Sequence, residues 1–145
     1  MASENTGLLT VSIVTPGRRV VGPVSVRRIT LPGGKGEMTI LPGHARLLST
    51  LETGILSFEQ DNQKVTHAAV SHGFIEINDD GVTVLADTLE LPEEIDADRA
   101  RKAQERAESQ LRAKENFEAD MVKWQRKLQR AMTRQQLASL GKQHR

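Results

Sequence analysis

The chain has 145 residues and a formal net charge of +1, a length that suits one ordinary domain or two small ones. It contains no Cys, which excludes disulfides, thiolate chemistry and cysteine metal sites. With three Phe, one Trp and no Tyr, an aromatic stacking platform for single-stranded nucleic acid is disfavoured.

Charge and glycine content both change at Leu91-Pro92. Residues 1–91 carry 7 basic and 10 acidic side chains, a net charge of −3, whereas residues 92–145 carry 13 and 9, a net charge of +4. Ten of the eleven glycines precede this point. We therefore predict two domains, residues 1–91 and 92–145. The chain shows neither a run of about 18 apolar residues, as a membrane span needs, nor a secretory signal pattern.

The first domain has the alternation of apolar and polar residues that strands show. Leu9, Val11 and Ile13 alternate with Thr10 and Ser12, for example. Strands or short apolar runs are expected at residues 9–13, 20–29, 37–41, 54–59, 64–70, 74–77 and 82–86, with a loop at 31–37 and a hairpin turn at 79–81. Many short strands separated by turns predict an all-β N-terminal domain, an antiparallel β-sandwich or flattened barrel.

Residues 36–56, GEMTILPGHARLLSTLETGIL, form the most informative stretch. Pro42 presets φ for the first central position of a turn, and Gly43 accepts the positive φ that a type II turn needs at the next.

The second domain is expected to be helical, because no Gly or Pro occurs between Asp96 and Leu140. Two apolar stripes have helical spacing. The first comprises Ala100, Ala103, Ala107 and Leu111, and the second Phe117, Met121, Trp124, Leu128 and Ala131. A turn at residues 114–118 would make an α-helical hairpin, and a single helix of about 45 residues is the alternative. Gly141 is expected to end the helix.

Asp96 is a natural helix N-cap. Helix capping explains Asp96 but leaves Arg99 unexplained, because a cation in the first turn opposes the helix dipole. We expect Arg99 to have an ionic partner, which is Asp98, Glu94 or an external group. Arg106, Arg126, Arg130 and Arg134 extend the basic character of the helices. They predict a solvated face or a surface for an acidic partner or a phosphate, and nucleic acid is the weaker interpretation.

No catalytic constellation is apparent. The four His residues lack metal-ligand spacing, and no phosphate-binding glycine motif precedes a helix. We therefore expect neither a catalytic nor a metal site.

Five ordered motifs resemble the epsilon subunit of bacterial and chloroplast F-type ATP synthases. Besides residues 36–56, they are VSHGFIEI at 70–77, VTVLAD at 82–87, IDADRA at 95–100 and RAMTR at 130–134. The chain departs from the family pattern at Thr39, Arg46 and His72, where Gly, Pro and Gly are usual. The resemblance covers residues 8–140.

This resemblance implies a non-catalytic rotor subunit of the central stalk. It would couple the gamma subunit and the membrane rotor ring of c subunits to ATP synthesis driven by a proton gradient. Its C-terminal hairpin would inhibit ATP hydrolysis by reaching the alpha/beta catalytic head. The implied location is peripheral, at the cytoplasmic face of the bacterial plasma membrane, with the chloroplast thylakoid as the lesser alternative.

The resemblance also implies particular contact residues. Those for the ring and gamma are Gly33, Lys35, Glu37, Pro42, His44 and Arg46, and those for the catalytic beta subunit are Arg126, Arg130 and Arg134. No cofactor is required. A regulatory ATP is implied at Glu90, Ile95, Asp96, Arg99, Ala100, Arg106, Arg130 and Arg134, where a phosphate would complement both the helix start and Arg99. The alternatives are a free-standing nucleotide-sensing module and a basic helical adaptor for nucleic acid. The stalk-subunit interpretation expects no nucleic-acid partner.

Overall fold

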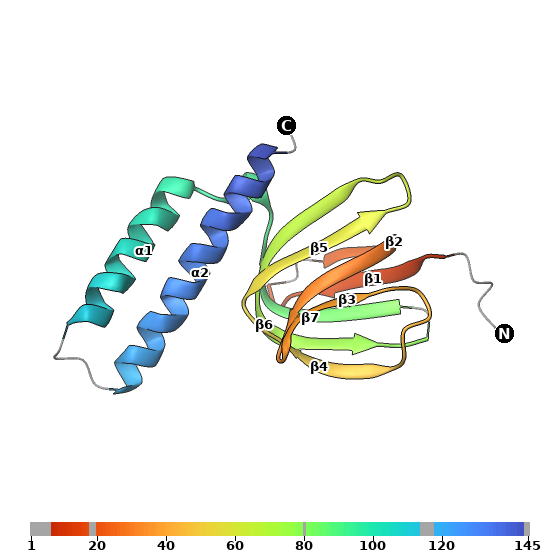
Figure 1. Cartoon of the computed structure of the whole chain (residues 1–145), viewed down its shortest axis with the longest axis horizontal. Coiled ribbons are helices and arrows are strands. Elements are labelled where there is room, and N and C mark those ends of the chain that lie inside the picture. Colours follow the sequence, from red (N-terminus) through yellow and green to blue (C-terminus); the bar gives the residue numbers. More distant parts are fainter. Residues whose placement is uncertain (1–6, 18–19, 80, 114–117, 144–145) are drawn as a thin grey trace. The chain divides into compact units, whose positions relative to one another are not determined.

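The computed structural model describes residues 7–17, 20–79, 81–113 and 118–143. The chain divides into two compact units, Met1–Leu89 and Glu90–Arg145. Strands make up the first unit, and helices make up most of the second (Figure 1).

The strands of the described residues form one seven-stranded sheet that folds back on itself. Their order is β1-β7-β6-β4-β2-β3, while β5 pairs with β2 and β6, and β1 also pairs with β2. The bounds are β1 (Leu9–Val14), β2 (Val20–Gly33), β3 (Gly36–Ile40), β4 (Leu47–Leu51), β5 (Gly54–Gln60), β6 (Val65–Ile77) and β7 (Gly81–Glu90).

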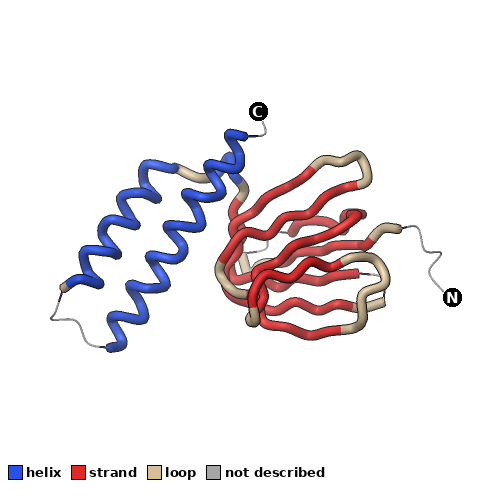
Figure 2. Tube along the Cα trace, in the orientation of Figure 1, coloured by secondary structure: helices blue, strands red, loops and turns tan. Residues whose placement is uncertain are grey.

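Two long strands produce the layered arrangement. The first part of β2, up to Val26, pairs with β1, whereas its later part pairs with β3 and β5. Likewise, residues 65–70 of β6 pair with β5 and residues 73–77 pair with β4. Each long strand therefore serves two sets of neighbours, which closes the sheet into the predicted β-sandwich (Figure 2). The predicted fold class is confirmed.

Alternate residues of these strands fill the space between the layers. Fully buried side chains include Val11, Val26, Ile29, Leu31, Ile40, Leu56, Ile75 and Val84, each with 0% of its surface exposed. Burial of one Val, Leu or Ile side chain contributes about 1.5–3 kcal/mol. The period-two pattern of the sequence therefore has its physical cause in this core.

Three strand predictions need correction. The expected loop at residues 31–37 is the end of β2, a tight turn and the start of β3, with Gly33 paired to Gly36. The apolar pair Leu47-Leu48 begins β4, a strand that sequence analysis missed. The two strands expected at 64–70 and 74–77 form one continuous strand, β6, which changes partner from β5 to β4 at residues 71–73, where His72 has a φ of +29°.

One pairing is parallel, although the sequence predicted an antiparallel sandwich. β1 runs parallel to β7, with Val14 opposite Leu85. The registered pairings of β2, β4, β5 and β6 are antiparallel. Strands that are far apart in the sequence are not joined by a hairpin, so β1 and β7 are free to run in the same direction.

Gly73 allows β6 and β7 to approach closely at the point where β6 changes partner. A Cβ atom on Gly73 would lie 1.8 Å from the backbone oxygen of Leu85 and 2.9 Å from its carbonyl carbon. No side-chain movement can relieve a contact with backbone atoms, so this position excludes any larger residue.

We predict that Gly73→Ala destabilises the sandwich by about 3 kcal/mol, at the upper end of the range for overpacking. Urea denaturation of the full chain, followed by backbone circular dichroism at a strand-sensitive wavelength, measures the effect. The matched control is Gly17→Ala, because a Cβ at Gly17 would have its nearest neighbour 3.9 Å away. Equal stability of the two variants would contradict the close approach.

The second unit contains a short 3-10 helix, η1 (Pro92–Glu94), followed by α1 (Ala97–Arg112) and α2 (Glu118–Gln143). The helical hairpin is confirmed, and α1 and α2 pack against each other. Its predicted turn falls mostly on residues 114–117, and the predicted seam residue Phe117 also lies outside the described residues. The buried side chains are Ala100, Ala107, Ala131, Thr133 and Leu137.

Two details of the helical prediction are wrong. Ala103 is exposed rather than part of the seam, whereas Leu137, which the stripes omitted, is fully buried. Helix α2 also continues past Gly141 to Gln143. Gly141 serves close packing instead, because a Cβ there would lie 2.7 Å from the Cβ of Pro92.

None of the helices in the described part of the chain combines the length and the apolar character that crossing a membrane requires.

Candidate functional sites

The turn at residues 41–44 has the predicted type II geometry. The His44 amide donates a hydrogen bond to the Leu41 carbonyl, with an N–O distance of 3.2 Å. Gly43 has a φ of +84°, which a side chain would strain. His44 is exposed, and its Nδ1 donates to the Ala45 carbonyl at 2.8 Å. Pro42 and Gly43 therefore fix the backbone, and this leaves the imidazole ring at the surface.

Arg46 forms a bidentate ion pair with Asp79, at the turn that follows β6. Its Nε lies 2.9 Å from Oδ1 of Asp79, and its Nη2 lies 2.6 Å from Oδ2. The hydrogen bond and charge of Arg46 lower the pKa of Asp79, and those of Asp79 raise the pKa of Arg46. Both side chains are exposed, at 72% and 68%. A paired guanidinium therefore stands where proline is usual in the resembled family.

We predict that Arg46→Ala raises the pKa of Asp79 towards its ordinary value, because both the hydrogen bond and the charge are lost. A carboxyl-carbon NMR titration of the two proteins measures this shift. Since folding lowers the pKa of Asp79, its stabilising effect is present above the unfolded-state pKa and disappears as the pH falls through the folded-state pKa. An unchanged titration in Arg46→Ala would show that the pair does not form in solution.

The three other predicted ring contacts lie at the tip where β2 turns into β3. Gly33 is buried, whereas Lys35 and Glu37 are exposed. The Gly34 amide donates to the Thr50 carbonyl at 3.1 Å, and this bond holds the tip against β4. The structure thus brings Gly33, Lys35 and Glu37 together on one turn. Pro42, His44 and Arg46 lie on the separate segment between β3 and β4.

Sequence analysis missed an apolar row on the outer face of β1, β7, β6 and β4. Val14 is 36% exposed, Leu85 51%, Phe74 55% and Leu48 72%. Val14 and Leu85 are direct neighbours across the parallel pair, and Phe74 pairs with Thr50 of β4. The signal was available, since Phe74 and Leu85 occupy alternating positions that should face solvent. Grouped exposed apolar side chains commonly mark a contact surface for another protein.

The predicted nucleotide-binding residues fall in the second unit. Arg134 Nε donates to Glu90 Oε1 at 2.8 Å, and both side chains are partly exposed. Asp96 caps α1 as predicted, accepting the Arg99 amide at 3.0 Å. Ala100 is buried and Ile95 is half-buried.

Two arginines of this set have guanidinium nitrogens without partners among the described residues. Asp98, one expected partner of Arg99, instead pairs with Arg101 and Lys102, which lower its pKa. The guanidinium of Arg99 forms no ion pair with another of the described residues, and its side chain is exposed. The Nε atom of Arg130 is buried and has no hydrogen-bond partner in the described part. A buried donor without an acceptor is costly and suits an external acceptor.

Arg106 lies apart from these groups. Its Cζ is 5.6 Å from the centre of the Trp124 ring, which Lys123 and Lys127 also approach at 5.5 and 4.7 Å. Trp124 precedes Arg130 by six residues, or about 9 Å of helix. Arg126 is exposed on the same helix. Each of the three cations is attracted to the electron-rich face of the indole ring, while the three positive charges repel one another.

No group of three or more His, Asp or Glu side chains suitable for a metal ion occurs among the described residues. The sites described above consist of exposed loops, an apolar sheet face and arginines. These are the features of a protein that attaches to other molecules, a β-sandwich carrying a helical hairpin.

Family models identify both parts of this arrangement. Residues 8–92 match the beta-sandwich domain of the ATP synthase delta/epsilon chain, and residues 93–139 match its long alpha-helix domain. The chain belongs to the ATP synthase delta/epsilon chain family. The resemblance seen in the five motifs is confirmed, and the protein is an epsilon-type subunit of an ATP synthase.

Relatives match over most of their length. The chain is 41% identical over 128 residues to the ATP synthase epsilon chain of Desulfitobacterium hafniense strain Y51, covering 88% of this chain and 94% of the relative. It is 38% identical over 130 residues to that of Geobacter sulfurreducens, covering 90% and 93%. It is 44% identical over 126 residues to that of Nitratidesulfovibrio vulgaris strain DP4, covering 87% and 92%.

A solved structure shares the fold. A chain in the Euglena gracilis mitochondrial ATP synthase structure, whose title names OSCP/F1/c-ring, matches with a TM-score of 0.81 at 24% identity, covering 97% of this chain and 88% of that one. A chain in the Tetrahymena thermophila central stalk/c-ring structure matches with a TM-score of 0.54 at 16% identity, covering 90% and 93%.

Proposed function

We propose that this subunit is a non-catalytic part of the rotor, held on the central stalk between the gamma subunit and the membrane ring. Family membership supports the assignment to the stalk. The feature of this chain that carries it is the exposed apolar row Val14, Leu85, Phe74 and Leu48, since a solvated surface gains nothing from such side chains. Through this assembly the subunit would lie at the cytoplasmic face of the bacterial plasma membrane.

The division of labour follows from the two units. The sandwich has a continuous core and strands shared between layers, so it deforms little and can carry torque. Its apolar row would pack against gamma, and the turn with Gly33, Lys35 and Glu37 would contact the ring. The segment with Pro42, His44 and Arg46 would lie next to both gamma and the ring.

The hairpin is proposed as an inhibitor of ATP hydrolysis. Its seam is formed largely by small side chains, Ala100, Ala107 and Ala131, with Leu137 as the large exception. A seam that buries so little apolar area opens at a small free-energy cost, as a switching element requires. In the open state Arg126, Arg130 and Arg134 would contact acidic segments of the catalytic beta subunit.

We predict that deletion of residues 93–145 raises ATP hydrolysis by the assembled complex severalfold, because the inhibitory element is lost. The measurement is steady-state hydrolysis by purified complex, with co-purification of gamma as the control for assembly. Unchanged hydrolysis with gamma still bound would remove the inhibitory role and leave the stalk role standing. If gamma did not co-purify even with the full-length chain, the stalk role itself would be refuted.

A regulatory ATP bound by the closed hairpin is the second part of the proposal. Its support is two guanidinium groups with nitrogens that lack partners among the described residues, that of Arg99 at the start of α1 and that of Arg130 with its buried Nε. Guanidinium groups and the start of a helix both favour phosphate. Glu90, Ile95, Asp96, Ala100 and Arg134 would surround the ligand, while Arg106 would have to leave Trp124 to reach it.

We predict that Arg99→Ala and Arg130→Ala each weaken ATP binding to the full chain by about tenfold, the effect of losing one charged phosphate contact. Isothermal titration calorimetry measures the affinity. Arg112→Ala is the matched control, because it removes an exposed arginine from the last turn of α1. An equal loss in all three variants would indicate only non-specific attraction, and no heat with the unaltered chain would refute the site.

A further inference from the structure

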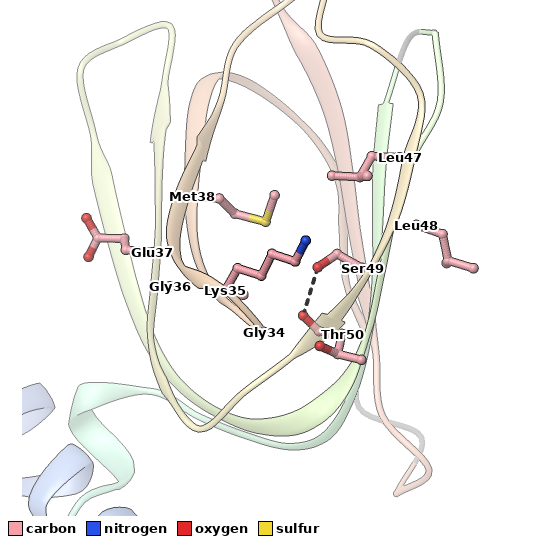
Figure 3. A pocket seen from close by; sticks show the side chains of 10 residues that line it. Gly34, Lys35, Gly36, Glu37, Met38, Leu47, Leu48, Ser49 and Thr50 are labelled. Atoms are coloured by element: carbon pink, nitrogen blue, oxygen red, sulfur yellow. Dashed lines mark hydrogen bonds between the residues drawn. The ribbon is translucent and has the colours of Figure 1, made fainter.

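A cavity of about 550 Å³ lies between the β2–β3 turn and β4. Residues 33–38 line one side and residues 47–50 the other (Figure 3). The close contact of Gly34 with β4 shapes its base, because a Cβ on Gly34 would lie 2.2 Å from Thr50 Oγ1. The sequence predicted a loop at this place and gave no sign of a cavity.

The lining combines one cation with apolar walls. Figure 3 shows the side chains of Lys35 and Met38 directed into the cavity, whereas Glu37 and Leu48 point away from it. Ser49 also lines the cavity, and its hydroxyl donates to the Thr50 carbonyl at 3.2 Å. The tip of the turn thus separates its two charges, with the ammonium group on the cavity side and the carboxylate outside.

Lys35 has no salt bridge with any residue in the described ranges. The nearest acid in sequence, Glu37, faces away from the cavity. Glu52, which follows β4, lies with its Oε2 3.8 Å from Nδ1 of His72 instead. Lys35 is exposed, but the apolar wall on one side of its ammonium group excludes part of the surrounding water, and this strengthens its attraction for an anion.

We propose that this cavity receives a carboxylate side chain from a loop of the membrane ring, and that Lys35 is its counter-ion. The carboxylate would accept hydrogen bonds from the ammonium group of Lys35. Met38 and Leu47 would cover the aliphatic part of the entering side chain. The proposal rests on the ring contact proposed above and adds the chemistry of the partner: an Asp or Glu at the contacting loop. Charge complementarity selects it over a basic or apolar loop.

The test uses the assembled complex in its native membrane, with a photo-crosslinking amino acid at Glu37. This residue is exposed at the rim of the cavity and its side chain points away from the cavity, so its replacement leaves the walls intact. After irradiation, mass spectrometry identifies the captured peptide. The expected product is a ring loop that contains an Asp or Glu.

Charge variants then test Lys35 itself. Lys35→Glu is expected to lower capture of the ring by at least about tenfold, because two carboxylates would face each other, and Lys35→Arg is expected to preserve it. Lys64→Glu is the matched control, since it makes the same charge change in the exposed turn before β6. Replacing the captured acid by Lys should restore capture with Lys35→Glu.

Several outcomes would overturn the proposal. They are a captured ring loop without an acidic residue, capture of lipid in place of protein, and equal capture with Lys35→Glu and Lys64→Glu. Co-purified gamma distinguishes these results from failure of the stalk assignment. If Lys35→Glu fails to co-purify with gamma and its circular dichroism spectrum shows that it is misfolded, Lys35→Met serves as the charge-loss variant. Lys35→Met should still lower capture of the ring.

Discussion

The path of β6 is the constraint on which the sandwich depends. This strand gives its first half to β5 and its second half to β4, and β7 lies alongside it. The change of partner occurs next to Gly73, where the backbone of Leu85 leaves no room for a side chain. Because side chains alternate between faces, the register fixed here also decides which residues of β4 and β6 enter the core and which form the exposed apolar row.

The helical unit is held together by less buried apolar surface than the sandwich and by a polar contact between its helices. Apart from Leu137, its buried apolar side chains are alanines, and a hydrogen bond between Gln104 and Gln135 crosses between the helices. Small residues let helices approach closely but contribute little transfer free energy. Polar cross-links specify one register without making the pair hard to separate. The sandwich is therefore suited to carry load, and the hairpin to change state.

Two exposed cations in the loops of the sandwich, Arg46 and Lys35, differ in whether they have an acidic partner among the described residues. Arg46 and Asp79 satisfy each other across the molecule, so the pair holds the segment after β3 to the turn after β6. Lys35 has no such partner and faces a cavity. Sequence alone ranks both as exposed cations in loops. Their difference comes from which carboxylates the fold places within reach.

The sequence by itself determined the two units, the sandwich, the hairpin, the Pro42-Gly43 turn and the Asp96 cap, because periodicity, turn chemistry and capping depend on neighbours in the chain. Its ordered motifs also determined the family. Tertiary structure alone decided that β1 runs parallel to β7, that β6 is continuous through residues 71–73 and that Gly141 packs on Pro92. It also decided that Arg130 Nε is buried without a partner and that Lys35 faces a cavity. These features arise from contacts between residues far apart in sequence, and no local pattern encodes the distance between such residues.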